Sequence, residues 1–197
     1  KNIIVLLDGC TNCRDQLLLL LLAETGFRIG ELLGVRYVED IDYQGCRIRV
    51  EPRVDNENKV RAKYEEDRWA KVSKDTFDIL LFYYAKYRKL LRESEYLFIT
   101  LSGEHAGQAL TEDAVNAMLR RLQKKTQIKV TSHMLRHYFA NERRKNGWSL
   151  ELISQALGHR NLQTTINYLN ISNEELVEAS EELFRKNAAL YMADKLL

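Results

Sequence analysis

The near absence of proline is the feature that most restricts how this chain can fold. Pro52 is the only proline in 197 residues, and the sequence holds only nine glycines. Proline blocks helix interiors and glycine weakens them, so a chain with few of either has few forced breaks in its backbone. The sequence therefore favours long helices, in a length that suits one well-packed domain.

Hydrophobic periodicity and turn residues add one short β region to this helical pattern. The predicted fold class is mainly α with a small antiparallel β-sheet (α+β). The apolar run at 17–23 is too short to span a membrane and predicts a buried helix. The expected elements are a helix over about 12–36, strands at 47–50 and within 60–72 joined by a turn at 55–58, a helix over about 74–91, an extended piece at 96–99, a helix that Thr111 opens, short helices from Ser132 onward with Ser149 as a cap, and a last helix that the capping box Ser172-x-x-Glu175 opens.

Charge and cysteine content set loose limits on function. The chain has 30 basic and 28 acidic residues and a net charge of +2, so nucleic acid is an allowed partner only if the basic groups cluster. Three cysteines give no disulfide framework and favour a reducing, cytoplasmic setting. Cys10 and Cys13 form a lone C-x-x-C without a second pair, so we interpret them as ordinary residues near a helix start.

The densest chemical segment is Ser132-His133-Met134-Leu135-Arg136-His137. His133 and Arg136 are spaced i, i+3 and share a helix face. An arginine fork clamps phosphate oxygens, and a histidine near neutral pKa moves protons. Taken alone, the segment fits equally well a solvated helix face with one packed histidine.

Two further segments complete a candidate set. Leu157-Gly158-His159 precedes Thr164-Thr165-Ile166-Asn167-Tyr168, and a helix break between them can bring His159 and Tyr168 to one site. Tyrosine needs a base and nearby positive charge to act as a nucleophile, and Tyr168 is one of ten tyrosines. In the third segment, Arg28 and Glu31 are again i, i+3, which fits either an oriented arginine or a surface ion pair. Together these groups suit phosphoryl transfer without a metal.

These three segments, in their order and spacing, resemble the motif boxes of the tyrosine recombinases, the phage-integrase family. The second box is S-H-M-L-R-H-Y-F-A and the third is L-G-H-R-N-L-Q-T-T-I-N-Y. The resemblance covers essentially the whole chain. It implies a site-specific DNA recombinase, such as the integrase of a phage, transposon or conjugative element, which needs no cofactor, metal or ATP.

The resemblance also implies roles for individual residues. Arg28 and Arg136 match the two catalytic arginines, and His133 matches the histidine that helps to deprotonate the nucleophile. His159 matches the group that hydrogen-bonds the scissile phosphate. Tyr168 matches the nucleophile, which forms a 3′-phosphotyrosine link and frees a 5′ hydroxyl. Glu31 and His137 resemble supporting residues behind the catalytic groups, and the DNA-contacting set is Arg28, Lys63, Arg136 and His159.

The general acid is a lysine on a β-hairpin in this family, five residues before an arginine. Lys63 stands at that spacing from Arg68, but the usual flanking glycine is replaced by Ala62. Lys59 and Lys71 lie close by in the sequence and remain alternatives.

Three rival interpretations share some of these features. A type IB topoisomerase uses the same chemistry, although the box spacings resemble the recombinases. A zinc enzyme is suggested by His133-x-x-x-His137, but the helix lacks the expected glutamate and Arg136 would repel the cation. A non-catalytic DNA-binding relic is disfavoured because every expected catalytic position is filled.

The resemblance predicts partners and domain organisation. Residues 1–172 form the expected catalytic domain, and residues 173–197 form a helical tail with a stripe of Leu176, Phe184, Leu183 and Leu190. The expected partners are double-stranded DNA at recombination sites and further copies of the chain, four of them on two sites, in the bacterial cytoplasm at the nucleoid and with no membrane. The tail either packs on its own domain or docks on a neighbouring subunit. The family's N-terminal DNA-binding domain is expected to be missing from this chain, which would weaken DNA affinity.

Overall fold

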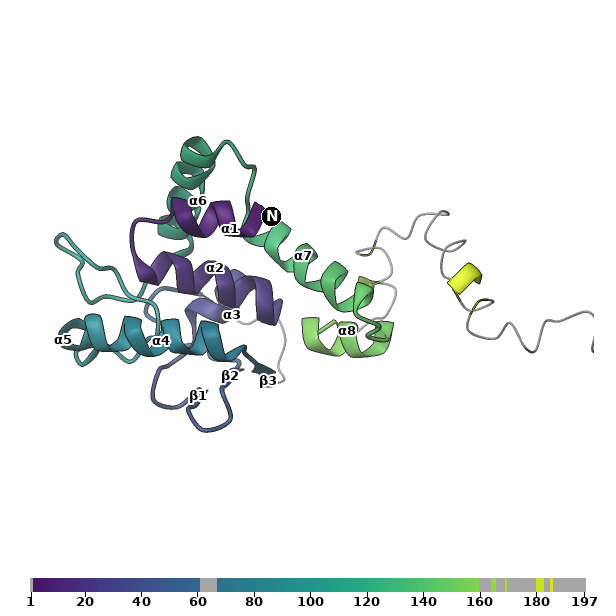
Figure 1. Cartoon of the computed structure of the whole chain (residues 1–197). Helices are drawn as coiled ribbons and strands as arrows, with labels where there is room; N and C mark the ends of the chain where they lie inside the picture. Colours follow the sequence, from purple (N-terminus) through teal and green to yellow (C-terminus); the bar gives the residue numbers. More distant parts are fainter. Residues whose placement is uncertain are drawn as a thin grey trace, which may run out of the picture.

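A computed structural model describes residues 2–60, 67–159, 164–165, 169, 180–182 and 185. It is mainly helical with one small antiparallel sheet, which confirms the predicted fold class. The elements of Figure 1 are α1 (Asn2–Gly9), α2 (Cys13–Thr25), α3 (Ile29–Leu33), β1 (Ile41–Asp42), β2 (Arg47–Val50), β3 (Arg68–Lys71), α4 (Lys74–Lys86), α5 (Arg88–Leu91), α6 (Glu112–Thr126), α7 (Ser132–Lys145) and α8 (Leu150–Leu157).

Helix α2 forms the centre of the molecule, because its leucine run has no polar face. It packs against α7 on one side and α4 on the other (Figure 1). Its five most buried leucines are fully inaccessible, and each contributes about 1.5–3 kcal/mol relative to an exposed position. The expectation of a buried helix is confirmed. These leucines are Leu17, Leu18, Leu19, Leu21 and Leu22.

The single helix predicted over 12–36 is wrong, because the chain turns sharply at Gly26. This residue has φ +66°, a left-handed conformation that ends α2, and its N–H bonds to the carbonyl of Leu22. A Cβ at this position would also overlap the ring of Phe139 on α7. Gly26 therefore provides both a sharp turn and a close approach between α2 and α7, whereas Gly30 lies within α3.

The sheet has the order β1-β2-β3 with antiparallel neighbours. The register pairs Val50 with Arg68 and Arg49 with Trp69. Ile48 and Val50 are buried, so the paired Arg68 also points to the inner face, whereas Trp69 points outward. The strand predicted within 60–72 is confirmed only for 68–71, because 61–66 lie outside the described residues.

The remaining helices follow the predicted caps more closely than the predicted lengths. Thr111 and Ser149 accept hydrogen bonds from the backbone N–H of Ala114 and Leu152, as N-caps do. The helix predicted over 74–91 is interrupted at Tyr87, and α7 is a single 14-residue helix capped by Thr131. The predicted capping box at Ser172 lies outside the described residues.

Two separate groups of buried side chains stabilise the described chain. The large core joins α1–α6, the sheet and Leu135 at the start of α7. A small core joins the later part of α7 to α8, which lies beside the end of α7 in Figure 1. Its buried members are Phe139, Ala140, Ile153, Leu157 and Leu169. Helix α7 therefore connects the two cores.

Two sequence expectations about special segments can be compared with the structure. Cys10 and Cys13 are free thiols at the α1–α2 junction, and burial, followed by the charge of Asp15, raises the pKa of Cys10 to about 12. Such a thiol stays protonated and unreactive.

Among the described residues, no helix combines the length and the apolar character that crossing a membrane requires.

Candidate active site

Two helix ends converge beside α7 and create the frame of the site. Helix α2 ends at Gly26 and helix α8 ends at Gly158, both in the left-handed conformation. The last carbonyls of a helix lack partners within it and carry the negative end of the helix dipole. The carbonyls of Gly26 and Leu157 therefore form a natural acceptor site for a cation.

Arg136 occupies this acceptor site. Its guanidinium donates to the carbonyl of Gly26 through Nη1, and to that of Leu157 through Nη2 at 2.6 Å. The residue is only 4% exposed, so these bonds replace the water that the charge has lost. Nη2 also lies 3.1 Å from Nε2 of His159. Arg136 thus links the α2 turn, the α8 turn and His159.

Arg28 and Glu31 form the second part of the site at the start of α3. Glu31 accepts from the backbone N–H of Arg28 at 2.8 Å, which closes the first turn of the helix. Its other oxygen accepts from the Arg28 guanidinium at 3.1 Å, and that guanidinium also reaches the carbonyl of Leu157 at 3.5 Å. Arg28 and Arg136 therefore share one carbonyl acceptor and lie next to each other.

The charge of Glu31 is maintained despite its burial. Burial opposes ionisation of the carboxyl, but the neighbouring Arg68, the N–H of Arg28 and the Arg28 charge outweigh it, so the pKa of Glu31 is lowered. The pair is thus a partly buried ion pair whose carboxylate is inaccessible, which disfavours the alternative of an ordinary surface ion pair.

His159 is held neutral by its surroundings. Burial, followed by the charges of Arg136, Arg28 and Arg68, lowers the pKa of His159 to about 4. Arginine can only donate, so Nε2 facing Arg136 must accept, and the ring proton then lies on Nδ1, 2.8 Å from Oγ1 of the buried Thr165. Thr165 fixes the ring orientation, a role that the sequence did not disclose.

Arg68 is, after Thr165, a second residue of the site for which the sequence predicted no role. Its position only served to identify Lys63, five residues before it. Its Nη2 lies 2.8 Å from Glu31, and its guanidinium stacks on Phe27 at 5.4 Å. The local sequence carries no signal for it, because the inward direction of Arg68 follows from the pairing of β3 with β2. The cluster of Arg28, Glu31, Arg68, Arg136 and His159, called the arginine cluster below, holds three guanidiniums against one carboxylate.

The two histidines on α7 contact each other. Nε2 of His133 lies 3.1 Å from Nε2 of His137, and the rings meet edge to face at 4.6 Å. One of these nitrogens must donate and the other accept, so one hydrogen bond joins the two rings. In the described part of the chain, no group of three or more histidine, cysteine or acidic side chains is placed to hold a metal ion.

The structure describes only some of the remaining predicted site residues. Lys63 and Tyr168 lie outside the described residues. Lys71 lies in β3 with its Nζ donating to the carbonyl of Gly45, and it faces outward like Trp69. Lys59 is exposed and has φ +59°. Because Arg68 points to the opposite face from Lys71, the geometry disfavours Lys71 as the general acid.

Comparisons with curated proteins find relatives that are named as a transposase and as recombinases. It is 35% identical over 177 residues to "Transposase A from transposon Tn554" of Staphylococcus aureus, an alignment that covers 89% of this chain and 49% of that protein. It is 32% identical over 183 residues to "Tyrosine recombinase XerA" of Pyrococcus horikoshii, with 92% and 58% covered. The chain thus spans about half the length of these curated relatives.

Solved structures show the same fold. The "Crystal structure of XerA recombinase" superposes with a TM-score of 0.73 at 27% identity, over 94% of this chain and 62% of that one. The XerH recombinase bound to its difH substrate gives 0.68 at 20% identity, over 90% and 51%, which is a likeness of fold. The "Phage integrase family" model matches residues 1–175. The chain belongs to the phage integrase family.

Proposed function

We propose that this chain is the catalytic part of a site-specific DNA recombinase that cuts and rejoins DNA through a 3′-phosphotyrosine intermediate on Tyr168. The observation that carries the proposal is the convergence of Arg28, Arg136 and His159, from three distant segments, around the carbonyl of Leu157. Fixed guanidiniums of this kind neutralise charge that spreads over the nonbridging oxygens of a phosphate in the transition state.

Each group has a role in this proposal. Arg28 and Arg136 bind the nonbridging oxygens, and Glu31 holds Arg28 in place. His159 is neutral above a pKa of about 4, so it supplies a hydrogen bond and not a charge. To donate to the phosphate, its ring carries the proton on Nε2 once a phosphate oxygen replaces Nε2 as the acceptor of Arg136, and Nδ1 then accepts from the Thr165 hydroxyl. His133, paired with His137, takes up the proton of the Tyr168 hydroxyl. Lys63 protonates the leaving 5′ oxygen. The phosphotyrosine keeps the energy of the broken bond, so rejoining needs no ATP or cofactor.

A nicked suicide substrate tests the chemistry. The nick lets the fragment beyond the cleavage site diffuse away, so a covalent protein–DNA adduct accumulates. We expect an adduct with the parent chain, also in the presence of a chelator, and none with Tyr168→Phe. An adduct that persists in Tyr168→Phe would refute the proposal, and one that requires a metal would favour the zinc interpretation.

Type IB topoisomerase-like nicking and rejoining is the alternative activity. It would use the same chemistry, but the curated relatives described above are a transposase and a recombinase. Relaxation of supercoiled DNA without any exchange between two sites would favour this alternative. The similarity to a transposon protein supports a role in a mobile element, with nucleoid DNA as its substrate.

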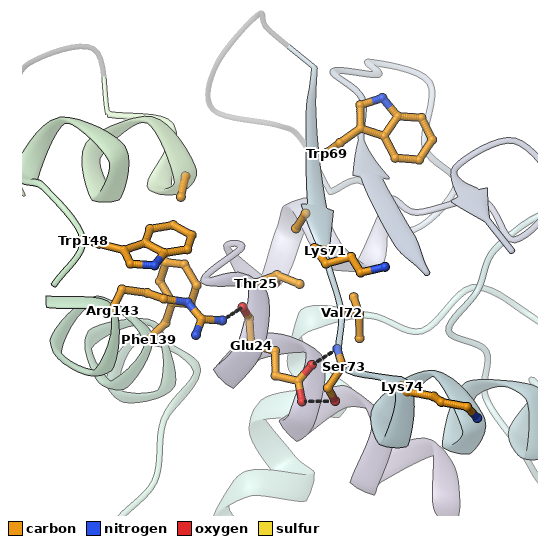
Figure 2. Close-up of a pocket in the computed structure, with 12 residues that line it drawn as sticks. Glu24, Thr25, Trp69, Lys71, Val72, Ser73, Lys74, Phe139, Arg143 and Trp148 are labelled. Carbon is orange, nitrogen blue, oxygen red and sulfur yellow. Dashed lines mark hydrogen bonds between the residues drawn. The ribbon is translucent and has the colours of Figure 1, made fainter. Parts of the chain in front are cut away.

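We further propose that the chain assembles as a tetramer on two DNA sites, with residues 173–197 docking on a neighbouring subunit. A cavity of about 610 Å³ lies between the end of α2, the β3–α4 junction, α7 and α8 (Figure 2). Phe139, Trp148 and the Arg143 guanidinium stacked on both rings form one wall. The two aromatic rings of this wall suit the leucine stripe of the tail.

Truncation and substitution test this assembly separately from catalysis. We expect deletion of the chain after Asn173 and Trp148→Ser each to abolish assembly of several copies on DNA, measured by gel shift and light scattering. The matched control is Phe82→Ser, at an exposed aromatic residue of α4 that does not line the cavity. Assembly that survives the deletion would contradict tail docking.

A further inference from the structure

Arg68 lies where the sheet meets the arginine cluster. It is the first residue of β3, five positions after Lys63, and its pairing with the buried Val50 turns its side chain inward. The side chain is 12% exposed, which is lower than the 24% of Arg28. A charge that is buried to this degree needs specific partners.

The contacts of Arg68 reach two of the segments that build the site. Its Nη2 lies 2.8 Å from Oε2 of Glu31, and the guanidinium lies over the Phe27 ring. It also lies against Gly158, the residue before His159. A Cβ at position 158 would approach Nη1 of Arg68 to 2.5 Å, which is closer than real contacts allow.

We propose that Arg68 is a positioning residue, which holds the Glu31 carboxylate and the Gly158–His159 turn in the geometry that cleavage requires. This inference rests on the proposed DNA cleavage activity. Arg68 also attaches β3 to the other members of the arginine cluster, at a position five residues after Lys63. Arg68 thereby connects the strand that follows the candidate general acid to the groups that bind the phosphate.

The geometry explains why this position needs an arginine. Glu31 divides its two oxygens, so that Oε1 accepts from the Arg28 side chain while Oε2 accepts from Arg68 and from the backbone of Arg28. A planar guanidinium can lie flat on Phe27 and still donate to the carboxylate at its edge. A lysine ammonium keeps the charge but loses the stacking and the fork.

The charge of Arg68 gives the proposal a second consequence. Arg68 is one of three arginines whose positive charges lower the pKa of His159. Removing that charge while the fold persists raises the pKa of His159 from about 4 towards the ordinary value. Arg68→Lys keeps the charge, so it keeps the pKa of His159 low.

The test compares Arg68→Ala and Arg68→Lys with Arg47→Ala. Arg47 lies on the outward face of the same sheet, where it pairs with Asp42 and stacks on Trp69, so it controls for the loss of a sheet arginine. Single-turnover cleavage of the suicide substrate at saturating protein is measured together with the Kd for the same DNA. The His159 pKa is measured by NMR, which is practical because the chain has four histidines.

We expect Arg68→Ala to slow cleavage by roughly 10- to 100-fold with little change in Kd, because small misplacements of catalytic groups reduce rates on this scale. The His159 pKa rises in Arg68→Ala and stays low in Arg68→Lys, which recovers only part of the rate. Arg47→Ala behaves like the parent. If Arg68→Ala does not fold, the partial rate and low His159 pKa of Arg68→Lys remain the required result.

Several outcomes would overturn the proposal. These are a parental cleavage rate in Arg68→Ala, a loss explained entirely by weaker DNA binding, an equal loss in Arg47→Ala, or an unchanged His159 pKa in folded Arg68→Ala. A parent chain that forms no adduct would refute the proposed function alone. The His159 titration of the Arg68 variants would then still decide whether Arg68 positions the turn.

Discussion

The large core and the small core place different halves of the same site. The large core surrounds α2 and α3 and fixes Arg28 and Glu31 within a densely buried body. Among the residues that the structure describes, the small core has five buried members, and it places the turn that carries His159. Arg136 joins the two by donating to a carbonyl from each side, Gly26 and Leu157. Within the described part of the chain, one half of the site is therefore held by extensive packing, and the other is held by the small core and one arginine.

Replacing the connecting arginine should have the largest effect. Arg136→Ala removes the proposed donors to the phosphate, so we expect a loss of about 10²- to 10³-fold in cleavage rate. It also leaves buried carbonyls at Gly26 and Leu157 without this partner, at about 1–3 kcal/mol each in the free energy of unfolding. Arg28→Ala is the control: we expect a comparable loss of cleavage with a smaller loss of stability, because Arg28 is more exposed. Equal stabilities in urea titrations would contradict the connecting role.

A pair of matched core substitutions tests whether the two cores act separately. Ile153→Ala and Leu80→Ala each empty a fully buried position, in the small and the large core respectively, at about 2–5 kcal/mol. We expect Ile153→Ala to accelerate hydrogen exchange in α8 but not in α2, and to slow cleavage roughly tenfold or more. Leu80→Ala should lower global stability while folded molecules cleave normally. Uniform exchange changes in both variants would show one cooperative core.

The smallest expected effect is the pH dependence that His159 adds to stability. Its pKa is about 4 in the folded chain against an ordinary 6.5, so between these values the unfolded chain binds the extra proton. The contribution is complete above about pH 6.5 and is lost as the pH falls towards 4. His159→Gln should lack this dependence. Urea unfolding of both chains at about pH 7.5 and 4.5 checks it, and parallel pH profiles would contradict the neutral buried His159.

Much of the candidate site could be predicted from the sequence, because the spacing of residues along a helix determines which side chains lie together. Arg28 and Glu31 lie one turn apart and interact as their spacing indicates. The fold class and the caps at Thr111 and Ser149 follow from local preferences, which act over a few residues. His159 could be placed near Arg136 only through the resemblance to a family, because 23 residues separate them.

The rest depends on tertiary contacts that no local pattern encodes. Arg68 turns inward because β3 pairs in one register with β2, and a shift by one residue would expose it. Gly26 breaks a strong helical run because Phe139 of a distant helix needs the space. Thr165 reaches His159 only once the α8 turn is formed. Each of these residues acts through a partner that the sequence places far away or in another element.

The most direct test of the account is to identify the residue that becomes linked to DNA. The adduct formed on the suicide substrate is digested with protease and nuclease, and the nucleotide-bearing peptide is sequenced by mass spectrometry. The account predicts a single modified residue, Tyr168, linked to a 3′ phosphate, with its yield reduced in Arg136→Ala. A link to any other residue, or to a 5′ phosphate, would contradict the assignment of the arginine cluster as a site that serves Tyr168.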